Sequence, residues 1–244
     1  MFHDVPQTER LRLRPYTIAD EAELFDVFAD PYARQFYPEM ADRGKVKGWI
    51  EWNLRNYDQL GFGLWAMELK VDGRFVGDCG LTYQDVEGRQ ELEIGYHVHE
   101  RERGKGYATE AARACLDFGF IHTSCQSICS IVRPSNAASC AVAGRVHSAR
   151  REFVKRDQPA LLFYTIRDDW ERLRTGREYA GRHADAGREL HLEFPGSTLF
   201  GLPHFYWHDF SRLRGRHDIH SGGSEPVLRE MRVVLSLTCL SAAA

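Results

Sequence analysis

The residues of this chain that most readily suggest chemistry lie in the short run Arg103–Ala108, with the sequence Arg-Gly-Lys-Gly-Tyr-Ala. Gly104 and Gly106 allow the backbone to curl until consecutive amide N–H groups face one anion. An alanine-rich helical pattern begins directly after the run, and a helix N-terminus offers unpaired amides and a partial positive charge. The run therefore suits a pyrophosphate, although a Gly-Lys-Gly before a helix is also common in plain turns.

Two phosphate-binding patterns that contain glycines do not match this run. A Walker loop requires a Ser or Thr after its lysine, whereas Gly106 follows Lys105. A dinucleotide-binding fingerprint requires Gly-x-Gly-x-x-Gly, which the run does not complete. The neighbouring elements must therefore indicate which anion the run would bind.

The apolar patterns predict alternating strands and helices on both sides of the run. Two-residue alternation and β-branched stretches predict strands over residues 8–14, 62–69, 75–83, 91–98, 126–132, 152–155 and 161–166. Helical spacing predicts helices over residues 17–28, 45–57, 107–118 and 137–146. Thr17 and Asp20 match a capping box at the start of the first helix. The glycine run thus joins a strand to a helix.

The composition is that of a globular protein whose last part differs from the rest. The net charge of -3 argues against nucleic acid as a partner, because phosphate contacts demand a basic face. The chain has neither an apolar run long enough to cross a bilayer nor the basic-then-apolar start of a secretory signal, so a cytoplasmic location is expected. Gly, Arg and His are scattered without period over 171–195. We therefore predict a catalytic domain over residues 1–170 and a C-terminal extension over 171–244.

The spacing of cysteines and histidines predicts no metal site. Cys125 and Cys129 lack the second pair of ligands that zinc requires. His204 and His208 have a helical i,i+4 spacing, but no Glu follows His204, and the aromatic residues around them favour a packed cluster. The six cysteines are expected to act as small buried hydrophobic residues in a reducing cytoplasm.

Together with its neighbours, the glycine run resembles an acyl-CoA-binding signature. Arg-x-x-Gly-x-Ala after a strand is similar to the signature of the GNAT N-acetyltransferase superfamily. The stretch Glu93–Tyr96, the continuation of the run to Ala111, and Pro134–Ser139 resemble the RimJ/RimL-type branch. The Thr8–Arg14 opening and the Gly63–Ala66 strand fit the same branch. The resemblance spans about residues 7–168.

The resemblance implies an α/β (α+β) fold with a mixed, mostly antiparallel sheet flanked by helices, plus the C-terminal extension. Two neighbouring parallel strands, here 91–98 and 126–132, would splay apart and admit the pantetheine arm of acetyl-CoA. The arm would pair with the strand backbone like an added strand, and Gly95 would be a bulge or close-approach residue. The residues implied to bind acetyl-CoA are His97, Val98, Arg103, Gly104, Lys105, Gly106, Tyr107, Ala108 and Asn136.

Acetyl transfer to an amine needs a neutral nucleophile, an oxyanion donor and a proton donor for the thiolate. Direct attack is expected, with the backbone amide near His97 as the oxyanion donor. Glu93 shares the face of Gly95, and burial would raise its pKa and suit it to accept the ammonium proton. Glu91 competes for this role, and a strand glutamate is also often a solvated cross-strand partner. Ser139 is implied to lie near the sulfur, or is an ordinary first-turn helix serine.

The sequence departs from the family pattern at the helix predicted over 137–146. Many GNAT enzymes have a tyrosine general acid where this chain has Ala143. The Glu-Lys-x-Gly that usually ends the helix is replaced by Gly144–His147, which removes a left-handed cap residue. How this helix ends is therefore left open.

The acceptor implied by the resemblance is an amine, either a protein N-terminus or a small molecule. Tyr37, Pro38 and the first two helices are expected to shape its site. No nucleic acid, membrane or metal partner is expected, and a homodimer is left open. The alternative is a non-catalytic acyl-CoA-binding module that acts through protein interactions of the extension, which the altered 144–147 segment favours.

Overall fold

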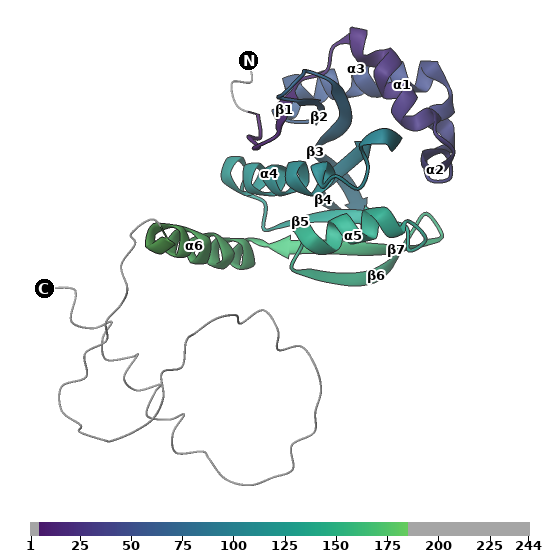
Figure 1. The fold of residues 1–244 in the computed structure, drawn as a ribbon. Coiled ribbons are helices and arrows are strands. Elements are labelled where there is room, and N and C mark those ends of the chain that lie inside the picture. Colours follow the sequence, from purple (N-terminus) through teal and green to yellow (C-terminus); the bar gives the residue numbers. More distant parts are fainter. Residues whose placement is uncertain (1–4, 185–244) are drawn as a thin grey trace, which may run out of the picture. The chain divides into compact units, whose positions relative to one another are not determined.

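The computed structural model of the chain describes residues 5–184, with side chains up to residue 175 (Figure 1). The strands are β1 (Leu11–Arg14), β2 (Leu64–Leu69), β3 (Phe75–Val86), β4 (Arg89–Val98), β5 (Ser127–Val132), β6 (Ala149–Lys155) and β7 (Gln158–Ile166). The helices are η1 (Ile18–Asp20), α1 (Glu21–Ala29), α2 (Pro31–Arg34), η2 (Pro38–Ala41), α3 (Arg43–Leu60), η3 (Glu100–Glu102), α4 (Tyr107–His122), α5 (Ala137–Val146) and α6 (Arg167–Ala184). The predictions for His204, His208 and the rest of the extension beyond residue 184 lie outside the described residues.

One seven-stranded sheet organises these elements, in the order β1-β2-β3-β4-β5-β7-β6. Among the described strands only the β4–β5 pair is parallel, because α4 carries the chain across the sheet between them. β4 and β5 pair at Leu92–Ile128 and Glu93–Cys129, and beyond these residues the two strands separate. The predicted mixed sheet with two splayed parallel strands is confirmed.

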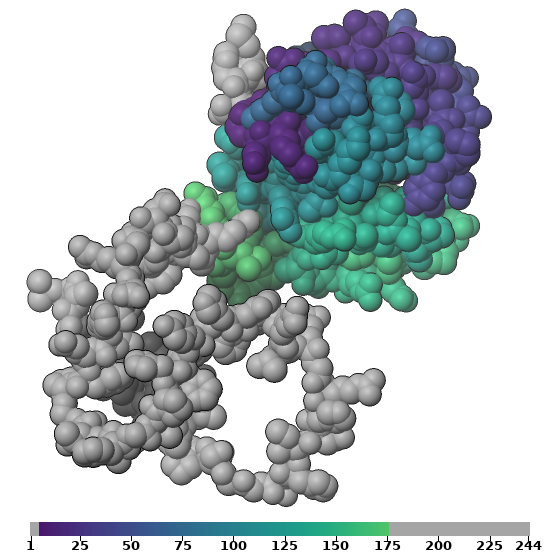
Figure 2. Space-filling view, viewed as in Figure 1, coloured from purple at the N-terminus to yellow at the C-terminus, as the bar shows by residue number. Residues whose placement is uncertain are grey.

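Helices cover both faces of the sheet where β2, β3 and β4 lie. Trp65 of β2 packs edge-on against Phe118 of α4, with ring centroids 5.2 Å apart. Trp65 and His97 are in register with consecutive residues of β3, so their side chains lie on opposite faces. His97 contacts Phe28 of α1 at 4.8 Å between centroids. Helix α4 therefore covers one face, and α1 with α3 covers the other (Figure 1). In the space-filling view the N-terminal elements (purple to blue) and the last described strands (green) lie on opposite sides of the central elements (teal) (Figure 2).

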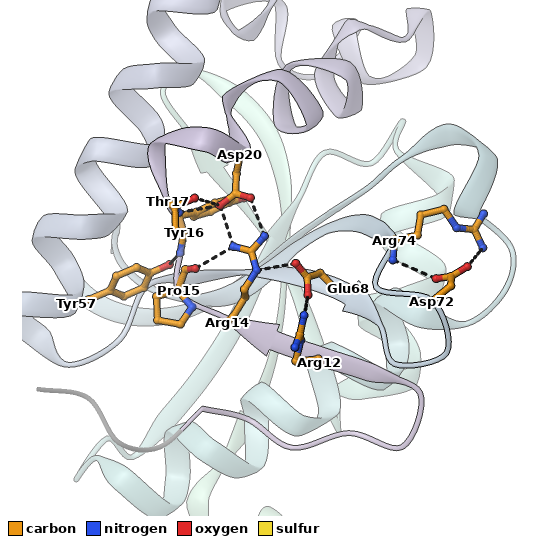
Figure 3. Close-up of polar contacts among 10 residues, drawn as sticks. All are labelled: Arg12, Arg14, Pro15, Tyr16, Thr17, Asp20, Tyr57, Glu68, Asp72 and Arg74. Carbon is orange, nitrogen blue, oxygen red and sulfur yellow. Dashed lines mark hydrogen bonds and ion pairs between the residues drawn. The ribbon is translucent and has the colours of Figure 1, made fainter.

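A charged network fixes β1 to its surroundings (Figure 3). Arg14 donates to Glu68 of β2 at 2.7 Å and to Asp20 of η1 at 2.7 Å. Arg12 donates to the same Glu68 carboxylate. The backbone N–H of Thr17 donates to Asp20 at 2.7 Å, so the predicted capping box is formed. These contacts set the angle at which the chain leaves the sheet and enters α1.

The structure contains helices that the sequence patterns did not predict, namely α2, η2, η3 and α6. Helix α6 runs through residue 170, where the domain boundary was placed. Trp170 is 4% exposed, stacks on Phe120 with centroids 5.1 Å apart, and donates to Asp117 at 2.6 Å. The packed core therefore includes at least the first turn of α6, and the division at residue 170 stays a prediction.

The cysteines are mostly placed as small apolar residues. Cys79, Cys115 and Cys129 are buried, while Cys125 and Cys140 are half-buried. Burial raises the pKa of the Cys79 and Cys129 thiols, so both are held in the neutral form. Cys239 lies outside the described residues.

Candidate active site

Two cavities lie at the splay between β4 and β5. The larger has a volume of about 1050 Å³ and extends over the glycine run and the start of α4. The smaller has a volume of about 330 Å³ and lies between η2, α3, β4 and the β6–β7 turn. Six residues line both cavities: Phe36, Tyr37, Tyr96, His97, Asn136 and Ser139. Molecules bound in the two cavities would therefore meet at these side chains.

The glycine run forms a loop at the end of the larger cavity. All residues of Arg103–Ala108 line this cavity, as do His97, Val98 and Asn136. Gly104 and Gly106 have φ angles of 77° and 85°, a region that only glycine adopts easily. Gly106 is the N-cap of α4, so the unpaired first-turn amides of the helix open beside the loop. The structure thus brings the predicted cofactor residues together, while their role in binding stays a prediction.

The cations of this loop are held by buried or half-buried carboxylates. Arg103 forms an ion pair with Asp30, the N-cap of α2, and its Nε donates to the Val98 carbonyl at 3.2 Å. Lys105 Nζ lies 2.9 Å from Glu102, which is 1% exposed. Asp30 and Glu102 were not predicted, because nothing in the sequence pattern distinguishes them from solvated acidic residues. The charge of the loop is therefore positioned by these two carboxylates.

The backbone of β4 presents alternate peptide groups to the gap. The Ile94 carbonyl accepts from Ser130 of β5 at 2.8 Å, so residue 94 faces β5. Residues 96 and 98 face the same way, because peptide groups alternate along a strand. The His97 carbonyl faces β3 instead, where a Cβ on Gly77 would lie 2.0 Å from it. The expected amide near His97 is therefore that of residue 96 or 98.

Gly95 is not a bulge residue. The β3–β4 register runs without a shift through the pair Gly80–Gly95. The register shift in this part of the sheet lies between β2 and β3, where Val76 of β3 is the extra residue opposite Met67 and Glu68. A Cβ on Gly95 would lie 3.4 Å from a Leu64 methyl group, so the glycine keeps this face open toward the smaller cavity. The bulge alternative for Gly95 was therefore wrong, and its role as a close-approach residue stays a prediction.

A buried carboxylate orients His97. His97 Nδ1 lies 2.6 Å from Asp78, which is fully buried and also accepts from the Tyr16 hydroxyl at 2.7 Å. A carboxylate only accepts hydrogen bonds, so Nδ1 carries the proton and Nε2 keeps its lone pair in neutral His97. The ring is packed among Phe28, Tyr37 and Trp49, and His97 lines both cavities. The sequence did not indicate this pair, because its members lie on different strands.

Glu93 lies in the smaller cavity. Its carboxylate accepts from the Ile131 backbone N–H at 3.1 Å, and burial raises its pKa even though the nearby Lys155 favours the charged form. Glu93 lines the smaller cavity, whereas Glu91 does not. A carboxylate whose pKa is raised by burial is suited to accept a proton from a bound amine.

Asn136 and Ser139 lie where the two cavities meet. Asn136 Oδ1 accepts from the Ser139 backbone N–H at 3.1 Å, which caps α5, and from the Tyr32 hydroxyl at 2.8 Å. The Tyr96 hydroxyl donates to the Ser139 carbonyl at 2.9 Å. Burial raises the pKa of Tyr96, so this phenol keeps its proton beside the position expected for sulfur. Tyr96 therefore acts here as a neutral hydrogen-bond donor that holds the start of α5 against β4, a contact that sequence patterns did not indicate.

His147 explains how α5 ends without a glycine cap. It is the C-cap residue in extended conformation, and its ring is buried below the splay. The Ser130 hydroxyl donates to the Ile94 carbonyl, so its oxygen accepts from His147 Nε2–H at 3.1 Å. The other ring nitrogen, Nδ1, accepts from the Thr165 hydroxyl at 3.2 Å. Burial lowers the pKa of His147 to about 4. A neutral histidine therefore ties β4, β5 and β7 together where the backbone pairing of β4 and β5 stops.

Comparison with known proteins identifies the class that this fold and site define. Residues 10–148 match the family described as "Acetyltransferase (GNAT) domain", so the chain belongs to the GNAT acetyltransferase family. YkkB of Bacillus subtilis (strain 168), an uncharacterised protein, is 40% identical over 140 residues, or 57% of this chain and 81% of YkkB. The uncharacterised N-acetyltransferase p20 of Bacillus licheniformis is 28% identical over 178 residues, or 71% of this chain and 97% of p20.

Solved structures share the fold. An acetyltransferase from Agrobacterium tumefaciens str. C58 is 28% identical, with a TM-score of 0.58 over 67% of this chain and 96% of that one. The aminoglycoside acetyltransferase AAC(6')-Ib in complex with coenzyme A is 19% identical, with a TM-score of 0.57 over 67% and 99%. RimL, a ribosomal L7/L12 alpha-N-protein acetyltransferase in complex with coenzyme A, is 16% identical, with a TM-score of 0.55 over 67% and 98%.

The described part of the chain has neither a membrane-spanning helix nor a cluster of metal-binding side chains. None of its helices has the length and apolarity that crossing a membrane requires. Nor do three or more metal-binding side chains gather there at one point.

Proposed function

We propose that this protein transfers the acetyl group of acetyl-CoA to a primary amine by direct attack of the amine on the thioester. The observation that carries the proposal is the meeting of two cavities at the β4–β5 splay. The larger ends at the Arg103–Ala108 loop, which suits a pyrophosphate, and the smaller contains Glu93, which suits an amine. Relatives named N-acetyltransferases and fold neighbours solved with coenzyme A support the same interpretation.

The donor would occupy the larger cavity. Its phosphates would face the first-turn amides of α4 and the backbone around Gly104 and Gly106. Its pantetheine arm would follow the β4 backbone, whose peptide groups at residues 96 and 98 face the gap. Part of that edge is already used, because the Val98 carbonyl accepts from Arg103. We therefore expect the pantetheine arm to hydrogen-bond mainly to the amide N–H groups of β4, and less to the Val98 carbonyl.

The acceptor amine would lie in the smaller cavity. Its nitrogen would form a C–N bond with the acetyl carbon while the C–S bond breaks, and an amide N–H of β4 would stabilise the oxyanion. Glu93 would accept the proton that the ammonium group loses before it attacks. The second proton, which the nitrogen loses as the amide forms, would pass to the CoA thiolate, which would leave beside Ser139. No protein nucleophile is required.

His97 is a second candidate for the base, on the evidence of its bond to Asp78. Its free Nε2 would accept the proton directly or through a water molecule. The two candidates are separated by thiol-release kinetics of Glu93→Gln and His97→Gln over a range of pH. Loss of kcat in Glu93→Gln with unchanged CoA affinity would support Glu93. Wild-type kcat in Glu93→Gln, with loss of the rising limb of the pH profile in His97→Gln, would assign the role to His97.

Finer features of the function also remain proposals. RimJ/RimL-like chemistry, with a peptide N-terminus or a small molecule as acceptor, follows from the resemblance. A cytoplasmic location follows from the sequence patterns described above. Tyr37 lines both cavities, and Pro38 opens η2 beside them, as an acceptor wall would require. Whether the protein forms a homodimer is tested by light scattering on the purified protein. Tight CoA binding without turnover on any amine or N-terminal peptide would instead favour a non-catalytic acyl-CoA-binding module.

A further inference from the structure

Basic side chains gather at the smaller cavity and form no ion pairs among the described residues; Lys155 donates to Gln84 at 3.1 Å and interacts electrostatically with Glu93. Arg133, Lys155 and Arg156 line this cavity. Among residues 5–175, no carboxylate lies within ion-pair distance of any of the three. Arg103 and Lys105 at the larger cavity are each paired with a carboxylate. The charge at the acceptor cavity is therefore available to a ligand.

Arg156 occupies a turn position that favours other residue types. It forms the two-residue β6–β7 turn with Asp157, and their φ angles are 50° and 60°. Turns with positive φ at both central residues favour Asn and Gly, which adopt this conformation readily. An arginine gains nothing locally from this position. Strained residues of this kind cluster at ligand clamps, and this one lies on the wall of the acceptor cavity.

Aromatic side chains form part of the same cavity wall. Trp49 lines the cavity beside Phe36 and Tyr37, and its Nε1–H is shielded from solvent and unpartnered among the described residues. The carboxylates that line the cavity are Glu39 and Glu93, so the three basic side chains outnumber them.

We infer that the acceptor is a small primary amine that also carries an anionic group, a carboxylate or a phosphate. The amine would lie at Glu93, and the anionic group would lie against Arg133, Lys155 and Arg156. The inference rests on the proposed acetyl transfer and narrows its acceptor. A volume of about 330 Å³ is at the lower end for small-molecule sites. A diamine would place its second positive charge against the same basic side chains, which opposes binding.

The test compares amines of equal length that differ only at the far end. Acetyl transfer is measured with 4-aminobutyrate, butylamine and 1,4-diaminobutane, and with the corresponding series from two to six carbons. Aminoalkyl phosphates of the same lengths distinguish phosphate from carboxylate. The best anionic amine is expected to exceed its alkylamine counterpart in kcat/KM by about tenfold to a hundredfold, as hydrogen bonds between charged groups allow. An alkylamine or a diamine that reacts as well overturns the inference.

Variants test the residues that carry the inference. Arg156→Asn keeps a residue that tolerates the turn and removes the charge, and Arg133→Gln removes a second charge. Each is expected to lower the anionic-to-neutral ratio of kcat/KM by about tenfold, mainly through KM. Arg55→Gln is the matched control, because Arg55 is exposed on α3 and lines neither cavity. An unchanged ratio in both cavity variants overturns the inference.

A binding measurement separates this inference from the proposed function. If no amine is acetylated, acetyl transfer fails as the function, and the panel is titrated into CoA-saturated protein by calorimetry. Tighter binding of anionic amines that is lost in Arg156→Asn upholds the inferred ligand class. If the amines with a carboxylate, a methyl group and a second amine at the far end bind equally, or if none of them binds, the inferred ligand class is overturned.

Discussion

Replacing His147 tests whether a buried neutral histidine makes this fold sensitive to acid. Burial lowers its pKa to about 4, from the 6.5 of an exposed histidine. Ser130 accepts from Nε2–H, and Thr165 donates to Nδ1. A second proton would have to be placed on Nδ1, where the Thr165 hydrogen now points. The folded state therefore resists protonation, and the unfolded chain does not.

The sign and size of the effect follow from this difference. Well above pH 6.5, at about pH 7.5 and higher, both states hold the neutral imidazole, so His147 contributes almost no pH dependence there. As the pH falls from 6.5 toward 4, the His147 imidazole is protonated in the unfolded state but not in the folded state. The free energy of unfolding therefore decreases over this range. The free energy of unfolding is expected to fall by about 2 kcal/mol between pH 7.5 and pH 5, and by about 3 kcal/mol below pH 4.

Urea unfolding of the wild type and His147→Gln at pH 7.5 and pH 5 measures this contribution. The variant is expected to be less stable at pH 7.5 by about 1–3 kcal/mol, because it leaves buried polar groups unsatisfied. Its further loss on going to pH 5 is expected to be about 2 kcal/mol smaller than that of the wild type. His122→Gln controls for removing one histidine, because His122 is exposed on α4. If the free energy of unfolding decreased equally between pH 7.5 and pH 5 in the wild type and in His147→Gln, the proposed contribution of His147 to acid sensitivity would be refuted.

Three further predictions concern the loop, α5 and the extension. Gly106→Val is expected to abolish the thermal stabilisation that CoA gives. Gly73→Val is the control, because it places the same side chain at a positive φ angle of 73° in a turn outside the site, and it should retain the stabilisation by CoA. Gly144→Ala should raise the free energy of unfolding by about 0.5–1 kcal/mol, because the new Cβ has room and would lie 3.9 Å from its nearest neighbour. Gly119→Ala should instead lower the free energy of unfolding, because the new Cβ would lie 2.6 Å from a β5 side chain. Truncation after Ala184 should leave a folded CoA-binding protein by circular dichroism and thermal shift, and an insoluble product would mean that the extension completes the core.

The sequence predicted the parts of the site that depend on local patterns. The glycine run and the helix that begins at Asn136 are contiguous, so their spacing alone indicated a loop and a capped helix. The Asp78–His97 pair and the Arg103–Asp30 pair join residues 19 and 73 positions apart, and no periodicity specifies such partners. At Gly144–His147 the sequence revealed only a departure from the family pattern. The structure supplied the reason, since the buried side chain of His147 fixes the helix end in place of a glycine.

Asp30 links the donor loop to the start of α2. Its carboxylate accepts from the backbone N–H groups of Tyr32 and Ala33 at the start of α2, and it holds Arg103 at the donor loop. Tyr32 and Ala33 line the larger cavity, so a donor phosphate that draws Arg103 away would also change the charge beside this wall of the same cavity. By thermodynamic linkage, any ligand that binds against α2 and the donor would then alter each other's affinity by the same factor.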